Sequence, residues 1–331
     1  MKLLARSEIS REISRHSLSS AALKIALTHE IVVVDFTHGA AECDFGAPEY
    51  SMAPQTITDA DYEHISRIIY QHSRIHLGDG KRELISSRLG KRLRATGCET
   101  YSEYCSLLGR SEGEAEINHL VDAISTNHTF FFREKKHFSF LEDTVLREFH
   151  QNPAYRGDGC FRCWSAAAST GEEPYSIAIT LARHEDLRPG FRWEMDCSDI
   201  SRTALDAARL GIYMNERISD MPENVRRRFF QRGIGKQDGR SRAKQILRDR
   251  MSWHLMNLFQ EPYPFDKKFH LIFCRNVMIY FDRPSQEWLV QKMARLLVPG
   301  GYLKVGHSES LSTLKHGLQA VQPAVYRKPL N

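Results

Sequence analysis

The stretch that decides the fold is Ser165–Ala178, SAAASTGEEPYSIA, in which a short apolar strand turns through small residues into a helix. In nucleotide-binding folds this turn holds a phosphate at the positive end of the helix, and it needs several glycines so that the backbone can approach the ligand. Here the turn has one glycine, Gly171, followed at once by Glu172 and Glu173. Two carboxylates repel a phosphate, so the turn predicts a ligand that is cationic or rich in hydroxyl and amine donors. Helix capping is the alternative role for both acids, because acidic residues favour the first turn of any helix.

Apolar strands alternate with helices on both sides of this turn. The sequence predicts strands at 160–166, 193–199, 269–276, 299–310 and 320–328, and helices at 173–184, at 201–210 and from Pro284 onward. This alternation predicts a mostly parallel, doubly wound α/β sheet whose ligand lies at the carboxyl ends of the strands. The second strand ends in Asp199, at a position where an acid typically accepts hydrogen bonds from ribose hydroxyls. A ligand with a ribose and a positive charge but no phosphate describes S-adenosylmethionine.

The residues before the sheet have a different pattern. Thr58 and Asp61 form a capping pattern for a helix expected to stop at Gly78, and Thr100 and Glu103 form a capping box. Further helices are predicted at 81–97 and 114–125. We therefore expect a poorly ordered tail over 1–55, an all-helical domain with a linker over 56–135, and the α/β domain over 136–331.

Composition excludes several classes of protein. The 331 residues are 41% hydrophobic and 26% charged, and no apolar run approaches the roughly 20 residues of a membrane span. The N-terminus has neither a secretory signal nor a transit peptide, which predicts a cytoplasmic protein. Seven cysteines without regular spacing predict reduced thiols. The one CxxC pair, Cys160 and Cys163, lies in a strand, where it faces opposite sides, so no metal is expected there.

The formal charge of +5 is mild but unevenly distributed. Lys81–Arg94 has six basic residues against one acid, and Arg226–Arg250 has ten against two. Two basic surfaces predict an acidic macromolecular partner.

Several blocks together resemble the chemotaxis-receptor glutamate O-methyltransferases, the CheR family. They are STNHTFFFRE (125–134), WSAAASTGEEPYSIA (164–178), SDIS (198–201), AARLGIY (207–213), NL (257–258), FHLIFCRNVMIYFD (269–282) and LVPGGYLKVGHSES (297–310). The resemblance extends over about residues 56–328 and leaves only the N-terminal tail unmatched. It implies an all-helical domain followed by a Rossmann-like S-adenosylmethionine-dependent methyltransferase domain, with a small β-subdomain inserted at about 215–252. It also implies methylation of glutamate side chains on chemoreceptor helices, which releases S-adenosylhomocysteine.

The resemblance assigns roles to individual positions. It implies cofactor contacts from Asn127, Thr129, Arg133, Ala167, Glu173, Asp199, Asn257, Leu258, Arg275 and Asn276. For substrate docking it suggests the basic residues Lys81, Arg88 and Arg92 on the second helix, although a solvated helix face is the alternative. The loop with Gly233, Gly235 and Gly239 resembles family members that bind a pentapeptide from the receptor C-terminus by strand addition.

The chemistry of glutamate methylation needs little from the protein beyond positioning. A glutamate with an unperturbed pKa of about 4.3 is ionised at neutral pH, so the nucleophile needs no general base. We expect Arg133 to hold the acceptor carboxylate through a charge-assisted hydrogen bond. Tyr280 is expected to border the methyl group and the sulfonium with its ring. Nothing in the sequence requires more than a monomer.

Three alternatives stay open at this point. A nucleic-acid methyltransferase would explain the basic segments, but such enzymes commonly have an N-P-P-Y or D-P-P-Y stretch where this chain has CRNVMIYF (274–281). A catalytically inactive receptor-binding module would keep the fold, although Arg133, Glu173, Asp199 and Tyr280 are all present. A nicotinamide dehydrogenase is disfavoured by the missing glycines and the paired acids.

Overall fold

The computed structural model describes residues 56–111 and 113–330 of the chain. The tail predicted over 1–55 lies outside the described residues. The helices of the first part are α2 (Asp59–Ser73), η1 (Asp79–Lys81), α3 (Arg82–Thr96), α4 (Tyr101–Leu108) and α5 (Gly113–Ile124). They pack around one apolar cluster that includes Ile65, Leu89 and Leu120, so the helices have a core of their own.

Local capping explains where two of these helices begin. The Thr58 side chain accepts a hydrogen bond from the Asp61 N–H, and Thr100 and Glu103 form the predicted capping box at the start of α4. The expected end of the first helix at Gly78 is wrong. Helix α2 ends at Ser73 because Arg74 adopts a left-handed conformation with φ of 59°, which turns the chain toward the sheet.

The second part contains a seven-stranded sheet in the order β6-β2-β1-β7-β8-β10-β9. Its strands are β1 (Cys160–Ser165), β2 (Arg192–Asp199), β6 (Met251–Leu255), β7 (Phe269–Phe273), β8 (Leu297–Lys304), β9 (Gln319–Gln322) and β10 (Val325–Arg327). The five strands from β6 to β8 are parallel to one another, and β10 pairs antiparallel with β8 on one side and with β9 on the other. The predicted α/β class with a mostly parallel sheet is confirmed.

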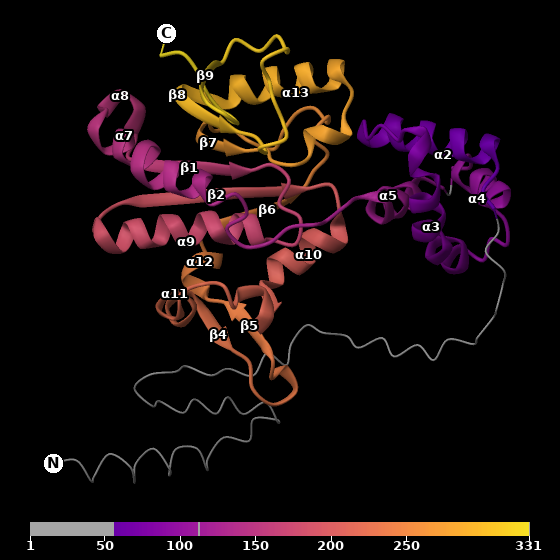
Figure 1. Cartoon of the computed structure of the whole chain (residues 1–331), viewed down its shortest axis with the longest axis horizontal. Coiled ribbons are helices and arrows are strands. Elements are labelled where there is room, and N and C mark those ends of the chain that lie inside the picture. The colour runs from indigo at the N-terminus through magenta and orange to yellow at the C-terminus, as the bar shows by residue number, and fades with distance from the viewer. Residues whose placement is uncertain (1–55, 112, 331) are drawn as a thin grey trace.

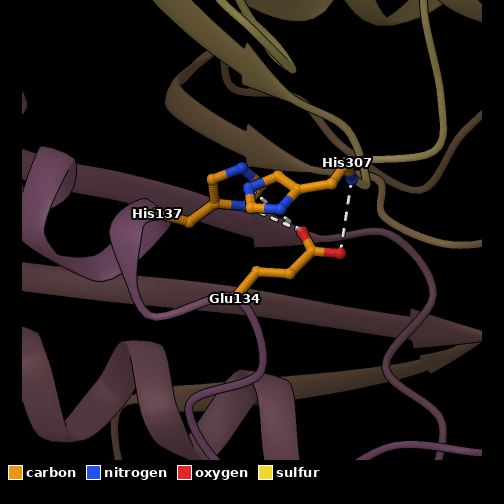
Figure 2. Close-up of side chains that lie close together, drawn as sticks. All are labelled: Glu134, His137 and His307. Carbon is orange, nitrogen blue, oxygen red and sulfur yellow. Dashed lines mark hydrogen bonds and ion pairs between the residues drawn. The ribbon is translucent and has the colours of Figure 1, made fainter.

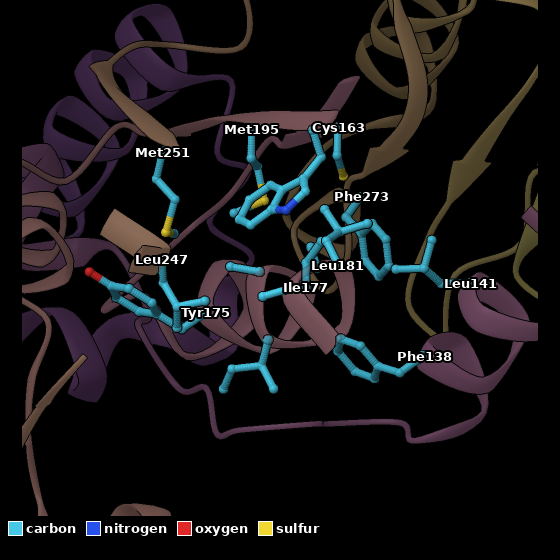
Figure 3. Close-up of a cluster of buried hydrophobic side chains, with 14 of the residues drawn as sticks. Phe138, Leu141, Cys163, Tyr175, Ile177, Leu181, Met195, Leu247, Met251 and Phe273 are labelled. Atoms are coloured by element: carbon cyan, nitrogen blue, oxygen red, sulfur yellow. The ribbon is translucent and has the colours of Figure 1, made fainter. Parts of the chain in front are cut away.

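Helices cover both faces of this sheet (Figure 1). They are α6 (Lys136–Phe140), the π-helix η2 (Leu141–Val145), α7 (Leu146–Gln151), α8 (Pro153–Arg156), α9 (Glu172–Leu187), α10 (Arg202–Leu210), η5 (Met278–Tyr280) and α13 (Arg283–Leu296). Ile177 and Leu181 of α9 pack in one buried cluster, together with Phe138 of α6 (Figure 3). Leu289 and Met293 of α13 belong to a separate cluster. Two separate cores are what a sheet with two covered faces requires.

Three of the predicted strands end or break earlier than expected. Strand β7 stops at Phe273 instead of 276, and Asn276 has a left-handed backbone with φ of 57°. Strand β8 stops at Lys304 instead of 310, because residues 306–309 form a turn closed by a hydrogen bond from the Glu309 N–H to the Gly306 carbonyl. The segment predicted as one strand at 320–328 is a hairpin of β9 and β10 that turns at Ala324, where φ is 62°.

A smaller unit is inserted between α10 and β6. It has a three-stranded antiparallel sheet in the order β3-β5-β4, formed by β3 (Ile212–Met214), β4 (Phe230–Arg232) and β5 (Arg240–Ala243). The short helices η3 (Asn215–Ile218), α11 (Glu223–Phe229), η4 (Gly235–Gln237) and α12 (Gln245–Arg248) complete it. Figure 1 shows this unit below α9 and α10. Among the described residues, no helix combines the length and the apolar composition needed to span a bilayer.

Candidate active site

A cavity of about 330 Å³ lies where the helical part meets the carboxyl ends of the parallel strands. Its walls include every residue predicted for catalysis or cofactor binding: Asn127, Thr129, Arg133, Ala167, Glu173, Asp199, Asn257, Leu258, Arg275, Asn276 and Tyr280. The helical part contributes residues from the end of α2, from η1 and from α3, Lys81 and Arg88 among them. The structure therefore brings these predicted residues together around one space, at the edge of the sheet where α/β folds bind their ligands.

Several hydrogen bonds hold the helical part against the strand ends, including those from the Ser201 and Thr203 hydroxyls to the Asp122 carboxylate of α5. The Tyr70 hydroxyl donates to Asp282 Oδ2 at 2.6 Å, and the His76 N–H donates to the Tyr280 carbonyl at 2.8 Å. The Asn257 side-chain amide donates to the His72 carbonyl at 2.5 Å. These hydrogen bonds fix the distance between the two walls of the cavity.

The turn after β1 needs its single glycine. Gly171 has a φ of 98°, and a Cβ added there would lie 2.6 Å from Tyr213 Oη and 2.9 Å from Ala208 Cβ. No L-residue fits this position without displacing a neighbour, because the conformation is unfavourable and the space is filled. Close packing against α10 and β3 thus accounts for the glycine in this turn.

The two adjacent acids of this turn point to different places. Glu172 is 1% exposed and forms an ion pair with Arg217 of the inserted unit. Glu173 lines the cavity, where Oε1 accepts from Ser165 Oγ at 2.8 Å and Oε2 accepts from Arg275 Nη1 at 2.9 Å. Burial raises the pKa of Glu173, although Arg275 and Ser165 oppose that shift. Of the pair, only Glu173 is a candidate for ligand contact.

Asp199 is held by the backbone of two loops. Its Oδ2 accepts from the Ser169 N–H at 2.7 Å, and its Oδ1 accepts from the Ser201 N–H at 2.9 Å. Burial raises the pKa of Asp199, and these backbone donors oppose that shift. Each carboxylate oxygen has two acceptor sites, so the group can also accept hydrogen bonds from a diol in the cavity.

The end of β7 is tied down by Glu309, a residue that sequence reasoning did not single out. The Glu309 carboxylate is buried and accepts from the N–H groups of Asn276, Met278 and Gly306 at 2.6–2.8 Å. Glu309 lies in the block GHSES, which carried the resemblance but had no role assigned to it. Its signal was an acid three residues after a glycine that follows a strand, a position suited to accepting from free N–H groups.

Arg133 and Tyr280 lie on the cavity wall. The Arg133 Nη1 donates to the His128 carbonyl at 3.0 Å, and its guanidinium lies 5.8 Å from the centre of the Phe130 ring. Tyr280 is half-buried and packs against the apolar cluster that contains α13. Contacts within the protein thus place both side chains.

The residues predicted for substrate docking lie in three different settings. Lys81 is exposed at the cavity, whereas Arg88 donates to the carbonyls of Ile124 and Ser125 and so supports the segment that leaves α5. Arg92 lies outside the cavity wall and forms a two-point ion pair with Glu116, with N to O distances of 2.9 and 2.5 Å. The hydrogen bond from Arg92 to Glu116 raises the pKa of the guanidinium.

The predicted glycine loop lies in the inserted unit, away from the cavity. Gly233, Gly235 and Gly239 connect β4 to β5, and the Gly233 N–H donates to the Arg240 carbonyl at 2.8 Å. A Cβ at Gly233 would lie 2.2 Å from the Gln237 carbonyl oxygen, so the loop closes too tightly for a side chain there.

Comparison with known families matches nearly all of the described chain. Residues 60–125 match the model of the CheR methyltransferase all-alpha domain, and residues 127–326 match that of the CheR methyltransferase SAM binding domain. A chemotaxis protein methyltransferase of Salmonella typhimurium is 42% identical over 258 residues, which cover 78% of this chain and 86% of that protein. One from Borreliella burgdorferi is 38% identical over 273 residues, which cover 82% of this chain and 95% of that protein.

Proposed function

The chain belongs to the CheR methyltransferase family, and from this we propose that the cavity at the strand ends is where an S-adenosylmethionine-dependent enzyme methylates chemoreceptor glutamates. The activity itself, donor-dependent methylation of chemoreceptors in chemotaxis, follows from the family and from relatives that match most of the chain. The assignment of this cavity and of its residues is our proposal. The observation that carries it is that every residue predicted for catalysis or cofactor binding lines this one cavity.

The donor fits the cavity in size and in chemistry. A volume of about 330 Å³ is at the lower end of the range for pockets that enclose a small ligand. We assign Asp199 to the ribose, because its carboxylate is already oriented by two backbone donors. Glu173 is assigned to the charged end of the donor, and Asn257 and Leu258 to the adenine. Asn127, Thr129, Ala167 and Asn276 complete the wall.

The bound donor supplies a methyl group on a positively charged sulfur. The acceptor is a carboxylate that is already ionised, so the residues of this chain need only orient it and exclude water. Arg133 is assigned to the acceptor carboxylate, since its position is fixed by the His128 carbonyl. Tyr280 is assigned to the wall beside the reacting atoms, where a ring face favours a cation.

The receptor reaches this site from the exposed side of the helical part. We propose that Lys81 contacts the acidic receptor helix at the cavity mouth. Arg88 and Arg92 would support the same face from inside, because both guanidinium groups are bonded within the helical part. We further propose that the enzyme works in the cytoplasm as a monomer, and that its domains divide at about residues 55 and 135.

The inserted unit is proposed to hold the receptor C-terminal pentapeptide. Its sheet order leaves β3 and β4 at the two edges, and an extended peptide can add to such an edge. The glycine loop from Gly233 to Gly239 lies at the end of β4. Titration with a receptor C-terminal pentapeptide, followed by fluorescence or calorimetry, tests this, and the absence of binding would refute the tethering role.

The function is tested by incubating the enzyme with methyl-labelled S-adenosylmethionine and receptor-rich membranes. A glutamate methyl ester releases its label in mild base, so we expect base-labile label on the receptors and none on membranes without receptors. Base-stable label on nucleic acid would support the nucleic-acid methyltransferase instead. Donor binding without transfer would support the inactive receptor-binding module.

A further inference from the structure

Glu134 lies behind the wall of the donor cavity and contacts that wall through Arg275. Arg275 lines the cavity, and its side chain is 1% exposed. Its Nη2 lies 2.9 Å from Glu134 Oε2, and its Nη1 lies 2.9 Å from Glu173 Oε2. One buried guanidinium therefore sits between two carboxylates, of which one faces the cavity and the other does not.

Glu134 is the ionised carboxylate of this buried group. Burial alone would raise the pKa of Glu134, but the hydrogen bond and the charge of Arg275 outweigh it, so the net shift is downward and the carboxylate stays ionised. Both oxygens of Glu173 act as hydrogen-bond acceptors, as expected for a carboxylate. His137 lies beside Glu134 and is neutral, because burial lowers its pKa to about 3. Glu134 thus contributes a full negative charge next to Arg275.

The two histidines beside Glu134 raise the alternative that this cluster binds a metal ion. Glu134, His137 and His307 each offer a ligand atom within 4.8 Å of the others (Figure 2). The Glu134 oxygen that faces both rings is, however, the Oε2 atom already bonded to Arg275. A divalent ion there would have to share this oxygen with a buried guanidinium, which is electrostatically unfavourable. The cation of this cluster is therefore Arg275 itself.

Glu134 is also tied to the loops around it. The His307 N–H donates to Glu134 Oε1 at 3.3 Å, and Arg275 Nη2 donates to the Arg133 carbonyl at 2.6 Å. Glu134 itself has a left-handed backbone with φ of 60°, which a side chain adopts only where its surroundings compensate for the strain. These contacts hold the carboxylate against Arg275 and keep it away from the ligand space.

We propose that Glu134 is a positioning residue that offsets the charge of Arg275 and so raises the affinity of the cavity for the cationic methyl donor relative to its uncharged product. This rests on the proposed function of the cavity. The donor carries a positive sulfur and S-adenosylhomocysteine does not, so the electrostatic effect of Glu134 acts on one ligand and hardly on the other. Without the charge of Glu134, the guanidinium of Arg275 is offset less, and the attraction for the sulfonium falls.

The test is calorimetric titration of the full chain with S-adenosylmethionine and, separately, with S-adenosylhomocysteine. Glu134→Gln removes the charge but keeps the shape and a hydrogen-bond acceptor. We expect its donor affinity to fall about tenfold and its product affinity by less than about threefold, as expected for loss of one charge near a partly screened site. Glu134→Asp keeps the charge, so it should retain the wild-type ratio of the two affinities even if both decrease.

A matched control is Glu148→Gln, which removes a carboxylate paired with Arg327 at 2.7 Å on the far side of the fold. It should leave both affinities unchanged. Equal weakening of both ligands by Glu134→Gln would show a purely structural role and would overturn the proposal, as would no change in either. If the wild-type chain bound neither ligand, the proposed function of the cavity would fail instead.

Discussion

Arg217 and Glu172 form an ion pair that joins the inserted unit to the first turn of α9. The Glu172 side chain is 2% exposed and the Arg217 side chain 44% exposed, so the carboxylate is buried beneath its partner. The same Arg217 Nη2 donates to the carbonyl of Thr129 at 2.7 Å. The Arg217 guanidinium thus connects the inserted unit, the turn between β1 and α9, and the segment between the two domains.

Arg217→Ala should destabilise the fold through the carboxylate that it leaves behind. An unpaired buried charge is costly, and we expect the free energy of unfolding to fall by about 2 kcal/mol, less than for a fully buried pair because Arg217 is partly solvated. Chemical denaturation measures this. The control is Arg227→Ala, which breaks an exposed pair with Glu223 and should cost less than about 1 kcal/mol. Equal losses in both variants would contradict a special role for Arg217.

Gly171→Ala should disturb the turn between β1 and α9, which borders the cavity. Alanine at a φ of 98° is strained, and its Cβ would also collide with Tyr213 and Ala208. We expect a loss of about 3 kcal/mol in the free energy of unfolding and weaker donor binding.

Gly190→Ala is a control that separates the backbone strain of an alanine from its collision with neighbouring side chains. Gly190 has a similar φ of 92°, but a Cβ there meets nothing within 4 Å. It should cost only about 1 kcal/mol, the backbone strain alone, and leave donor binding intact. If both variants lost the same stability, the close packing around Gly171 would be unimportant.

Arg133→Lys should slow methyl transfer while leaving the donor bound. Lysine keeps the positive charge but lacks the planar group that can hold a carboxylate at two points. We expect kcat to fall about 100-fold and donor affinity to change less than about threefold, since positioning of the acceptor is lost. Single-turnover kinetics with receptor membranes measures the first quantity and calorimetry the second. Arg147→Lys, on the exposed side of α7, is the control; unaltered turnover in Arg133→Lys would remove Arg133 from the mechanism.

Lys304 should make stability depend on pH. It is fully buried next to Arg275, and burial lowers its pKa to about 6 from an ordinary value of 10.5. Between pH 6 and 10.5 the unfolded chain therefore binds more protons at this residue than the folded protein does, and stability rises with pH across that window. Lys304→Met should remove this slope and raise the free energy of unfolding at pH 7 by about 2 kcal/mol.

Urea denaturation at several pH values measures both effects of Lys304→Met. The loss of the hydrogen bond from Lys304 to the His137 carbonyl offsets part of the gain. Lys91→Met on the exposed surface of α3 should leave the pH slope unchanged. A wild-type slope that persists in Lys304→Met would assign it to another group.

Features set by residues close together in the sequence could be predicted better than features set by residues far apart in the sequence. The capping box of Thr100 and Glu103 and the alternation of strands with helices are local patterns, and both appear in the structure. The different orientations of Glu172 and Glu173 could not be predicted, because Arg217 and Arg275 reach them from far along the chain. For the same reason the role of Glu134 depends on a guanidinium at the end of another strand.

The cavity exists only while two separate folding units are docked, since α2 and α3 provide one wall and the strand ends provide the other. Hydrogen bonds cross the interface between these two units, among them Tyr70 to Asp282, His76 to Tyr280 and Ser201 to Asp122. A molecule that binds in the cavity therefore stabilises the association of the two units. By thermodynamic linkage, association of the units strengthens binding of that molecule by the same free energy. Release of the product and separation of the two units are therefore coupled equilibria, each of which favours the other.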